Sequence, residues 1–322
     1  MQKKVSVIVP IYNAQKTLAS CLGNLVHQTL SEMELILVND ASTDGSLNIM
    51  LDCEQAFSDK VIVVNLDRNL GPGGARNAGL AYASGEYIGF VDSDDVPDIH
   101  MYEKLYTLAV SGEYDMVDGA YYDERTDTFK LQTADSCRGI LNEKKRSELI
   151  AGGGYLWSRL IRRELFEKFF FREHTILEDM ETLMILFMRT KRLGTTRDLV
   201  YKYNNSHTSA SKPSDPAYYH KAVTDAMRAV AEAMIPMENY AGVQSAVEYS
   251  ILHLYQCGIV NALHPNNTLS EDTKNFYLDE LRKLRFKYVK IPYEQNAYME
   301  KKFSKEDLQL MQNVDTCQNR EG

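Results

Sequence analysis

The stretch Tyr87-Ile88-Gly89-Phe90-Val91-Asp92-Ser93-Asp94-Asp95 is a short apolar run that ends directly in an acidic cluster. Such a run is typical of a strand buried on both faces, as in a parallel sheet. Asp92 and Asp94 are two residues apart at the strand's end, so both carboxylates can face one divalent cation. Hard oxygen ligands suit Mg²⁺ or Mn²⁺ bridging a diphosphate. The alternative is a solvated acidic turn that precedes the next helix.

Three similar runs lie upstream, at residues 5–9, 34–38 and 61–66, and helical patterns separate them. This alternation predicts an α/β fold in which a mostly parallel sheet carries helices on both faces. Ligands of such a sheet gather at the carboxyl ends of its strands.

Each of these three runs is followed by residues suited to a nucleotide. After the first run, Tyr12 can stack on a nucleobase. After the second, Asp40 can accept a hydrogen bond from a base or ribose, although a simple Asx turn is the alternative. After the third, the glycines of 71–76 allow backbone amides to approach a phosphate at a helix N-terminus, and Arg76 adds charge. A plain turn remains the alternative there.

The domain organisation changes near residue 205. Residues 111–205 mix strand and helix patterns and complete the first domain, predicted as 1–205. A polar loop follows, and helical patterns then occupy 217–234, 243–263 and 272–287. We therefore predict a helical C-terminal region over 206–322, with acceptor binding, homodimer formation and membrane-surface contact as its alternative roles.

Composition narrows the class of protein. The formal net charge of −9 argues against a nucleic-acid binder, which needs Lys and Arg to neutralise phosphates. The five scattered cysteines indicate neither a disulfide framework nor a zinc site. Residues 5–9 are too short for the apolar core of a signal peptide, and no segment is apolar over the length of a membrane span. We expect a cytoplasmic protein, with the inner face of the plasma membrane as the alternative site.

Basic and aromatic residues are interleaved over 282–290, and this pattern is the sequence feature that could support contact with a membrane surface. They fit either contact with anionic lipid or the solvated face of a packed helix.

Taken together, VSVIVPIYN (5–13), LVNDASTDGS (37–46), NLGPGGARNAGL (69–80) and YIGFVDSDD (87–95) resemble the family-2 glycosyltransferases with the GT-A fold. The resemblance covers roughly residues 5–205. It implies a donor that is a nucleotide-diphosphate sugar, often UDP-linked, and Mn²⁺ or Mg²⁺ as cofactor, held by Asp92 and Asp94. The residues that it implies in donor binding are Pro10, Tyr12, Asn13, Asp40, Gly73, Arg76, Asp92, Ser93 and Asp94.

The second half of the first domain carries weaker family features. Trp157 and Arg159 lie in a segment that looks like the family's acceptor-side WxKL motif, although Arg159 stands where Lys is usual. Glu178-Asp179 looks like the family's ED motif, with Asp179 expected as catalytic base and Glu178 as second choice. His207 corresponds to a position where some relatives supply a third metal contact; a solvated loop histidine is the alternative.

These features predict an inverting glycosyltransferase that moves a sugar to a hydroxyl of a glycan or lipid-linked acceptor in cell-surface polysaccharide synthesis. Two rival functions stay open. A sugar nucleotidyltransferase would carry a Gly-rich phosphate loop after its first strand, where this chain has Pro10-Ile11-Tyr12-Asn13. A non-catalytic nucleotide-sugar-binding protein would not need both acidic motifs.

Overall fold

The computed structural model describes residues 3–204 and 215–316, which form two compact units. The first unit comprises Met1–Leu141 and Gly154–Ser209, and the second comprises Asn142–Gly153 and Ala210–Gly322. Sequence reasoning placed one boundary near residue 205. The structure differs because the helix after Leu141 packs with the C-terminal helices, so Asn142–Gly153 leaves the first unit.

Four parallel strands make up the first half of the sheet: β1 (Val5–Ile11), β2 (Met33–Asn39), β3 (Val61–Asn65) and β4 (Tyr87–Phe90). All seven residues of β2 and all four of β4 are buried, as their continuous apolar runs predict. Within the described residues, the sheet has ten strands, and its main path runs β3-β2-β1-β4-β9-β6-β10-β5. The predicted α/β fold is confirmed, but the sheet is mixed and not mostly parallel: among the described residues, four strand pairings are parallel and five are antiparallel.

The second half of the sheet mixes parallel and antiparallel pairings. Strand β9 (Arg159–Arg162) runs antiparallel to both β4 and β6 (Met116–Asp123), while β10 (Arg192–Tyr203) is parallel to β6. The carboxyl ends of β4, β6 and β10 therefore share one edge of the sheet with the amino end of β9. Short strands β5 (Val96–Pro97), β7 (Thr128–Leu131) and β8 (Gly139–Ile140) pair at the margins.

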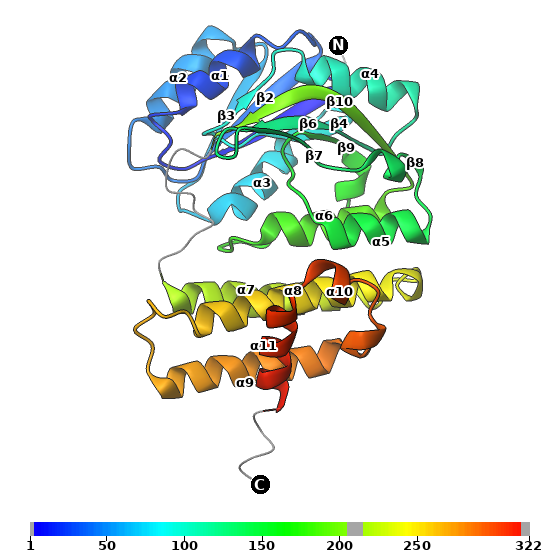
Figure 1. Ribbon diagram of the computed structural model, residues 1–322. Coiled ribbons are helices and arrows are strands. Elements are labelled where there is room, and N and C mark those ends of the chain that lie inside the picture. The colour runs from blue at the N-terminus through cyan, green and yellow to red at the C-terminus, as the bar shows by residue number, and fades with distance from the viewer. Residues whose placement is uncertain (1–2, 205–214, 317–322) are drawn as a thin grey trace. The chain divides into compact units, whose positions relative to one another are not determined.

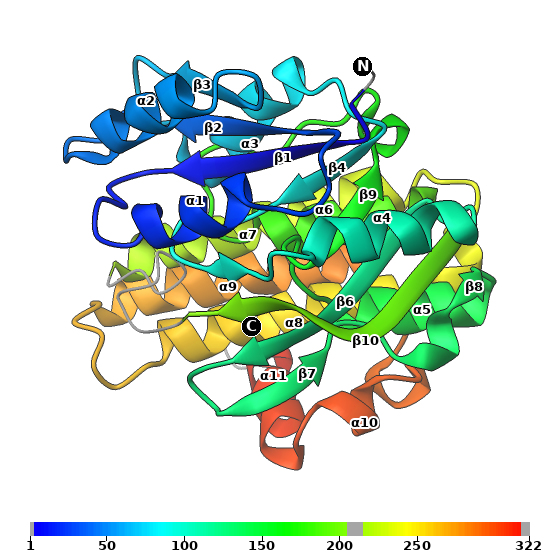
Figure 2. The same ribbon diagram turned by 90° about the horizontal axis from the view of Figure 1, so that it is seen from above.

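Helices cover both faces of this sheet. Figure 1 shows α1 (Leu18–Val26), α2 (Ser46–Ala56) and α4 (Met101–Ser111) on one face and α3 (Gly71–Tyr82) and α6 (Glu178–Arg189) on the other. The view from above in Figure 2 shows the strands fanned between these two layers. Helix α1 buries Leu18, Cys21, Leu22 and Leu25, which recur at helical spacing. Two short 3₁₀ turns, Asp135–Cys137 and Arg163–Phe166, complete the unit.

The second unit is helical, as predicted. Its long helices are α7 (Pro216–Met234), α8 (Gln244–Ala262) and α9 (Glu271–Tyr288), each within one or two residues of its predicted range. The central helix α8 packs against α5 (Glu143–Gly152), α7 and α9. The unit also contains the short helix α10 (Met299–Lys302), the helix α11 (Lys305–Thr316) and the 3₁₀ turns Ala241–Val243 and Tyr293–Gln295.

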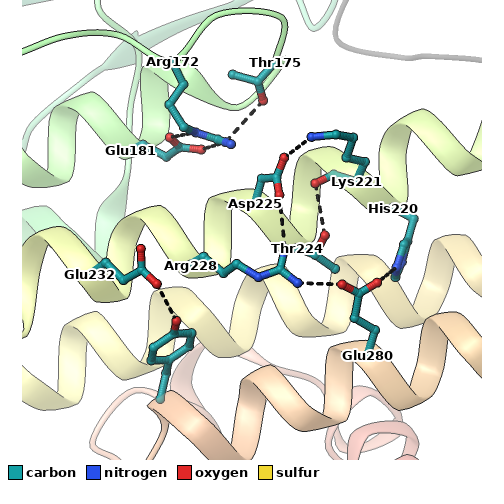
Figure 3. Close-up of polar contacts among 11 residues, drawn as sticks. Arg172, Thr175, Glu181, His220, Lys221, Thr224, Asp225, Arg228, Glu232 and Glu280 are labelled. Carbon is teal, nitrogen blue, oxygen red and sulfur yellow. Dashed lines mark hydrogen bonds and ion pairs between the residues drawn. The ribbon is translucent and has the colours of Figure 1, made fainter.

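A polar network joins α7 to α9 (Figure 3). His220 Nε2 lies 3.0 Å from Glu280 Oε2, and Arg228 donates to the other oxygen of Glu280 at 2.6 Å. The His220 ring stacks on Tyr277, with centroids 3.9 Å apart. Burial alone would raise the pKa of Glu280, but the hydrogen bonds from His220 and Arg228 hold that pKa below its ordinary value. The network therefore stabilises this helix pair most when Glu280 is ionised.

The alternating basic and aromatic stretch of α9 divides between core and surface. Leu284 and Tyr288 are buried, and Arg285 Nε lies 3.3 Å from Asp315 Oδ2. Phe286, by contrast, is 50% exposed and lies among exposed lysines. Among the described residues, no helix combines the length and apolar character needed to cross a bilayer.

Candidate active site

Three carboxylates converge on the guanidinium of Arg76, one from the loop after β4 and two from the first turn of α6. Its Nη1 atom lies 2.7 Å from Glu178 Oε1 and 2.9 Å from Asp179 Oδ1, and its Nη2 atom lies 3.3 Å from Asp92 Oδ1. Arg76 is only 3% exposed. One buried cation from α3 therefore ties the acidic end of β4 to the first turn of α6.

The glycines before Arg76 allow the backbone of residues 171–174 to pack closely against the start of α3. A Cβ on Gly73 would lie 2.1 Å from the carbonyl oxygen of Arg172, so only glycine fits there. Next to it, Asn77 donates to Phe171 O at 2.9 Å and accepts from Phe171 N at 2.8 Å. The segment 171–174 thus occupies the space beside Gly73 that the sequence suggested for a phosphate.

That same segment is fastened to α6. Arg172 Nε donates to Glu181 Oε2 at 2.6 Å, and Figure 3 shows the guanidinium facing both carboxylate oxygens of Glu181. Because α3 and α6 hold the segment from both sides, its continuation delivers Glu178 and Asp179 to Arg76.

Negative charge exceeds positive charge in this cluster. Burial raises the pKa of Asp92 and of Glu178, and for both the nearby Asp179 raises it further, while Arg76 opposes the shift. Burial also raises the pKa of Asp94. Oε2 of Glu178 and Nε of Arg76 are buried, and neither has a hydrogen-bond partner among the described residues. An additional cation would relieve the repulsion among these carboxylates.

The donor set fits Mg²⁺ or Mn²⁺. Asp92 and Asp94 supply hard oxygen atoms at a strand end. The described residues contain no group of three or more His, Cys, Asp or Glu side chains arranged to hold a metal. A pair of carboxylates matches the way Mg²⁺ is held by one or two protein ligands together with substrate phosphates. Ser93 lies between them, partly buried. His207, the expected third contact, lies outside the described residues.

Asp95, which follows Asp94 in the sequence, has a structural role: it anchors the acidic cluster to β10 and the residue after it. It is 1% exposed; its Oδ2 accepts from the Tyr201 hydroxyl at 2.9 Å and its Oδ1 accepts from Asn204 N at 2.7 Å. The Tyr201 hydroxyl in turn accepts from the backbone amide of Asp92 at 3.2 Å. Strand β10 therefore fixes the backbone of the acidic cluster.

The residues expected to hold a nucleoside lie at the carboxyl ends of β1 and β2. Pro10 lies within β1, and Tyr12 just beyond it is 52% exposed. Asn13 Oδ1 accepts from the backbone amide of Thr43 at 2.8 Å, which ties the two loops together. Asp40 is 2% exposed, and burial raises its pKa although it accepts from Leu70 N at 2.7 Å.

The expected acceptor residues are both enclosed. Arg159 is 0% exposed, and its Nη1 donates to Asp118 Oδ2 at 2.8 Å, so it serves as the partner of a buried carboxylate. Trp157 is 2% exposed and stacks between tyrosines. Tyr155, which sequence reasoning missed, is 44% exposed. Arg159, fully buried in its ion pair with Asp118, is therefore not accessible to an acceptor.

Comparison with known proteins gives consistent matches. The model of the family described as Glycosyl transferase family 2 matches residues 6–170. The "Uncharacterized glycosyltransferase EpsJ" of Bacillus subtilis (strain 168) is 31% identical over 79% of this chain and 74% of its own length. "Glycosyltransferase GlyG" of Streptococcus pneumoniae serotype 4 is 31% identical over 63% of this chain and 71% of its own.

Solved structures match the fold over the whole chain. The structure of S. aureus TarS residues 1–349 in complex with UDP-GlcNAc has a TM-score of 0.73 at 19% identity and covers 98% of this chain and 92% of TarS 1–349. The mannosyltransferase PcManGT of Pyrobaculum calidifontis, in complex with GDP-Man and Mn²⁺, has a TM-score of 0.55 at 15% identity, covering 100% of this chain and 82% of its own. The expected GT-A fold is confirmed.

Proposed function

Because this chain belongs to glycosyl transferase family 2, we propose that it transfers a sugar with inversion from a UDP-linked donor to a hydroxyl of a glycan or lipid-linked acceptor. The convergence of Asp92, Glu178 and Asp179 on Arg76 carries the proposal. It brings a carboxylate suited to binding a metal ion close to carboxylates suited to acting as a general base. The UDP-GlcNAc bound to TarS supports the donor class. We assign the product to cell-surface polysaccharide.

Asp92 and Asp94 hold the metal ion in this proposal. A Mn²⁺ or Mg²⁺ ion held by these two carboxylates would supply positive charge next to the departing diphosphate. The Mn²⁺ in the mannosyltransferase complex supports the choice of ion. On the donor's other side, Tyr12 stacks on the base and the buried Asp40 faces the nucleoside.

Asp179 acts as the base. Its side chain is 23% exposed, whereas that of Glu178 is 7% exposed, so Asp179 is the better placed of the two to meet an acceptor from solvent. Asp179 takes the proton of the acceptor hydroxyl while the acceptor oxygen attacks the anomeric carbon. The bond to the diphosphate breaks on the opposite side, which inverts the configuration. The ion pair with Arg76 orients the base before the proton moves.

Two substitutions test these roles: Asp94→Asn and Asp179→Asn. Each should abolish release of nucleoside diphosphate from UDP-sugars in the presence of Mn²⁺ and mixed glycan acceptors, with the melting temperature kept. Asp52→Asn, an exposed site on α2, is the matched control and should keep full activity. Near-normal turnover by either site variant refutes its assigned role.

The same assay separates the rival functions. A nucleotidyltransferase would release pyrophosphate instead of nucleoside diphosphate. A non-catalytic binding protein would bind UDP-sugars without consuming them under any acceptor condition.

We also propose that the second unit touches anionic lipid at the inner face of the plasma membrane. Helix α9 exposes Phe276 and Phe286, at 63% and 50%, together with Lys283 and Lys287, and Lys290 is exposed two residues beyond the end of the helix. Basic and aromatic side chains on one helix favour the interface of anionic membranes. Replacing the three lysines by Glu should release the protein from phosphatidylglycerol vesicles in co-sedimentation, and unchanged binding contradicts the proposal.

Homodimer formation stays a prediction that analytical ultracentrifugation can test.

A further inference from the structure

A stack of aromatic rings extends from the acidic cluster to the protein surface. Trp157 stacks on Tyr201, with ring centroids 4.7 Å apart and planes within 11°, and on Tyr155, with centroids 4.7 Å apart and planes within 10°. Tyr203 joins it, 5.1 Å from Trp157. Tyr201 and Trp157 are 1% and 2% exposed, whereas Tyr155 is 44% exposed. The stack therefore ends in an accessible tyrosine.

The inner end of this stack is part of the metal-binding edge. The Tyr201 hydroxyl accepts from Asp92 N and donates to Asp95, as described above. Charge on Asp95, Asp92 and Asp94 also contributes to raising the pKa of Tyr203, after burial as the main cause, to about 12. The exposed ring of Tyr155 is thus connected through two ring contacts to the residues that would hold the leaving group.

The sheet order places this stack opposite the nucleoside side. Tyr12 and Asp40 follow β1 and β2, on one side of β4. The aromatic rings come from β10 and from the residues before β9, on the other side of β4 and at the same sheet edge. With the acidic cluster in the middle, a donor lying over β1 and β2 leaves the side of Tyr155 for the acceptor.

The loop that carries Tyr155 is held in one conformation. Gln132 Oε1 accepts from Tyr155 N at 3.2 Å, and its Nε2 donates to Trp157 O at 3.1 Å. Gly154 has φ +139° and Ser158 has φ +60°, both in the left-handed region, so few alternative sequences would fit this loop. An aromatic ring whose plane is fixed before binding loses little entropy when a ligand stacks on it.

We propose that Tyr155 forms an acceptor subsite that binds a pyranose ring by stacking. Its ring offers the flat apolar surface that the C–H face of a sugar requires, and its hydroxyl offers a polar handle at the rim. Enclosed on its faces by tyrosines, Trp157 is the support of this platform and not its contact surface. The assignment to an acceptor rests on the proposed function; the stacking itself does not require turnover.

Saturation-transfer NMR with a panel of methyl glycosides and with UDP tests the subsite. The panel is methyl glucoside, galactoside, mannoside and N-acetylglucosaminide in both anomeric forms. The wild-type protein and Tyr155→Phe should transfer saturation to the ring protons of at least one glycoside. Tyr155→Ala should weaken that signal about fivefold or more while the UDP signal stays unchanged.

Tyr12→Ala is the matched control, because Tyr12 is similarly exposed on the nucleoside side. Tyr12→Ala should weaken the saturation-transfer signal of UDP and leave the signal of the glycoside unchanged. An equal glycoside signal in Tyr155→Ala overturns the proposal, as does a panel that gives no signal with the wild-type protein while UDP binds. Loss of the UDP signal in the wild-type protein would instead count against the proposed function. Tyr155→Phe keeps the ring, so its retained binding separates stacking from loss of fold.

Discussion

Replacing Arg76 by Met should destabilise the first unit strongly. The arginine side chain is 4% exposed and faces three carboxylates, of which Glu178 is 7% exposed. Removing one partner of a buried ion pair costs about 3 to 5 kcal/mol because the remaining charge stays desolvated. For a unit of this size each kcal/mol lowers the melting temperature by roughly 2 to 4 °C, so we expect a drop of about 6 to 20 °C.

The measurement is a thermal melt at neutral pH, monitored by near-UV circular dichroism, with and without Mn²⁺. Arg197→Met is the matched control, since its ion pair with Asp135 has side chains 74% and 51% exposed and should contribute less than about 1 kcal/mol. Adding Glu178→Gln to Arg76→Met should recover part of the loss by removing one unpaired carboxylate. Mn²⁺ should also stabilise Arg76→Met more than the wild-type protein, because it replaces a missing positive charge. A drop in Arg76→Met no larger than that of the control refutes this electrostatic reasoning.

Three further outcomes follow from the structure. Gly73→Ala should lower both the melting temperature and transfer, because the added Cβ meets backbone. Gly23→Ala should be neutral or slightly stabilising, because among the described residues no atom beyond the glycine's chain neighbours and its own helix backbone lies within 4 Å of the added Cβ. Equal effects of the two substitutions in parallel melts would contradict the packing role of Gly73. Chelation by EDTA should abolish transfer and Mn²⁺ should restore it, as followed by nucleoside diphosphate release; full activity without metal would argue against the assigned leaving-group chemistry. Because the pKa of Glu280 is lowered on folding by hydrogen bonds from His220 and Arg228, its stabilising contribution is present above the ordinary value of about 4.3 and is lost as pH falls through the lower folded value. Urea unfolding of wild-type protein and Glu280→Gln should therefore differ at neutral pH and converge in acid, and a constant difference would show that the charge is irrelevant.

The first half of the fold was predictable because its signal is local. Each buried strand is a continuous apolar run, and the helix that follows shows its own spacing, so the element order and the strand-end position of Asp92, Asp94, Tyr12 and Asp40 could be inferred without tertiary information. Long helices α7 to α9 were predictable for the same reason.

Strand β9 and the unit boundary were not predictable in this way. The strand begins with Arg159 and ends with Arg162, and the burial of Arg159 depends on Asp118, which is distant in sequence. Helix α5 lies within the first unit's stretch of chain, and its Ile150 carbonyl accepts from Ser250 of α8. Only the packing of distant segments decides such features.

The sequence by itself determined which chemical groups lie along the sheet edge, since the period of apolar residues fixes where each strand ends. The tertiary structure decided what those groups meet. It turned the glycines before Arg76 into a docking site for residues 171–174, and it gave Arg76 three carboxylate partners. It enclosed Trp157 and left Tyr155 at the surface. The physical reason is that exposure and charge pairing depend on contacts between residues far apart in the chain, which local spacing does not encode.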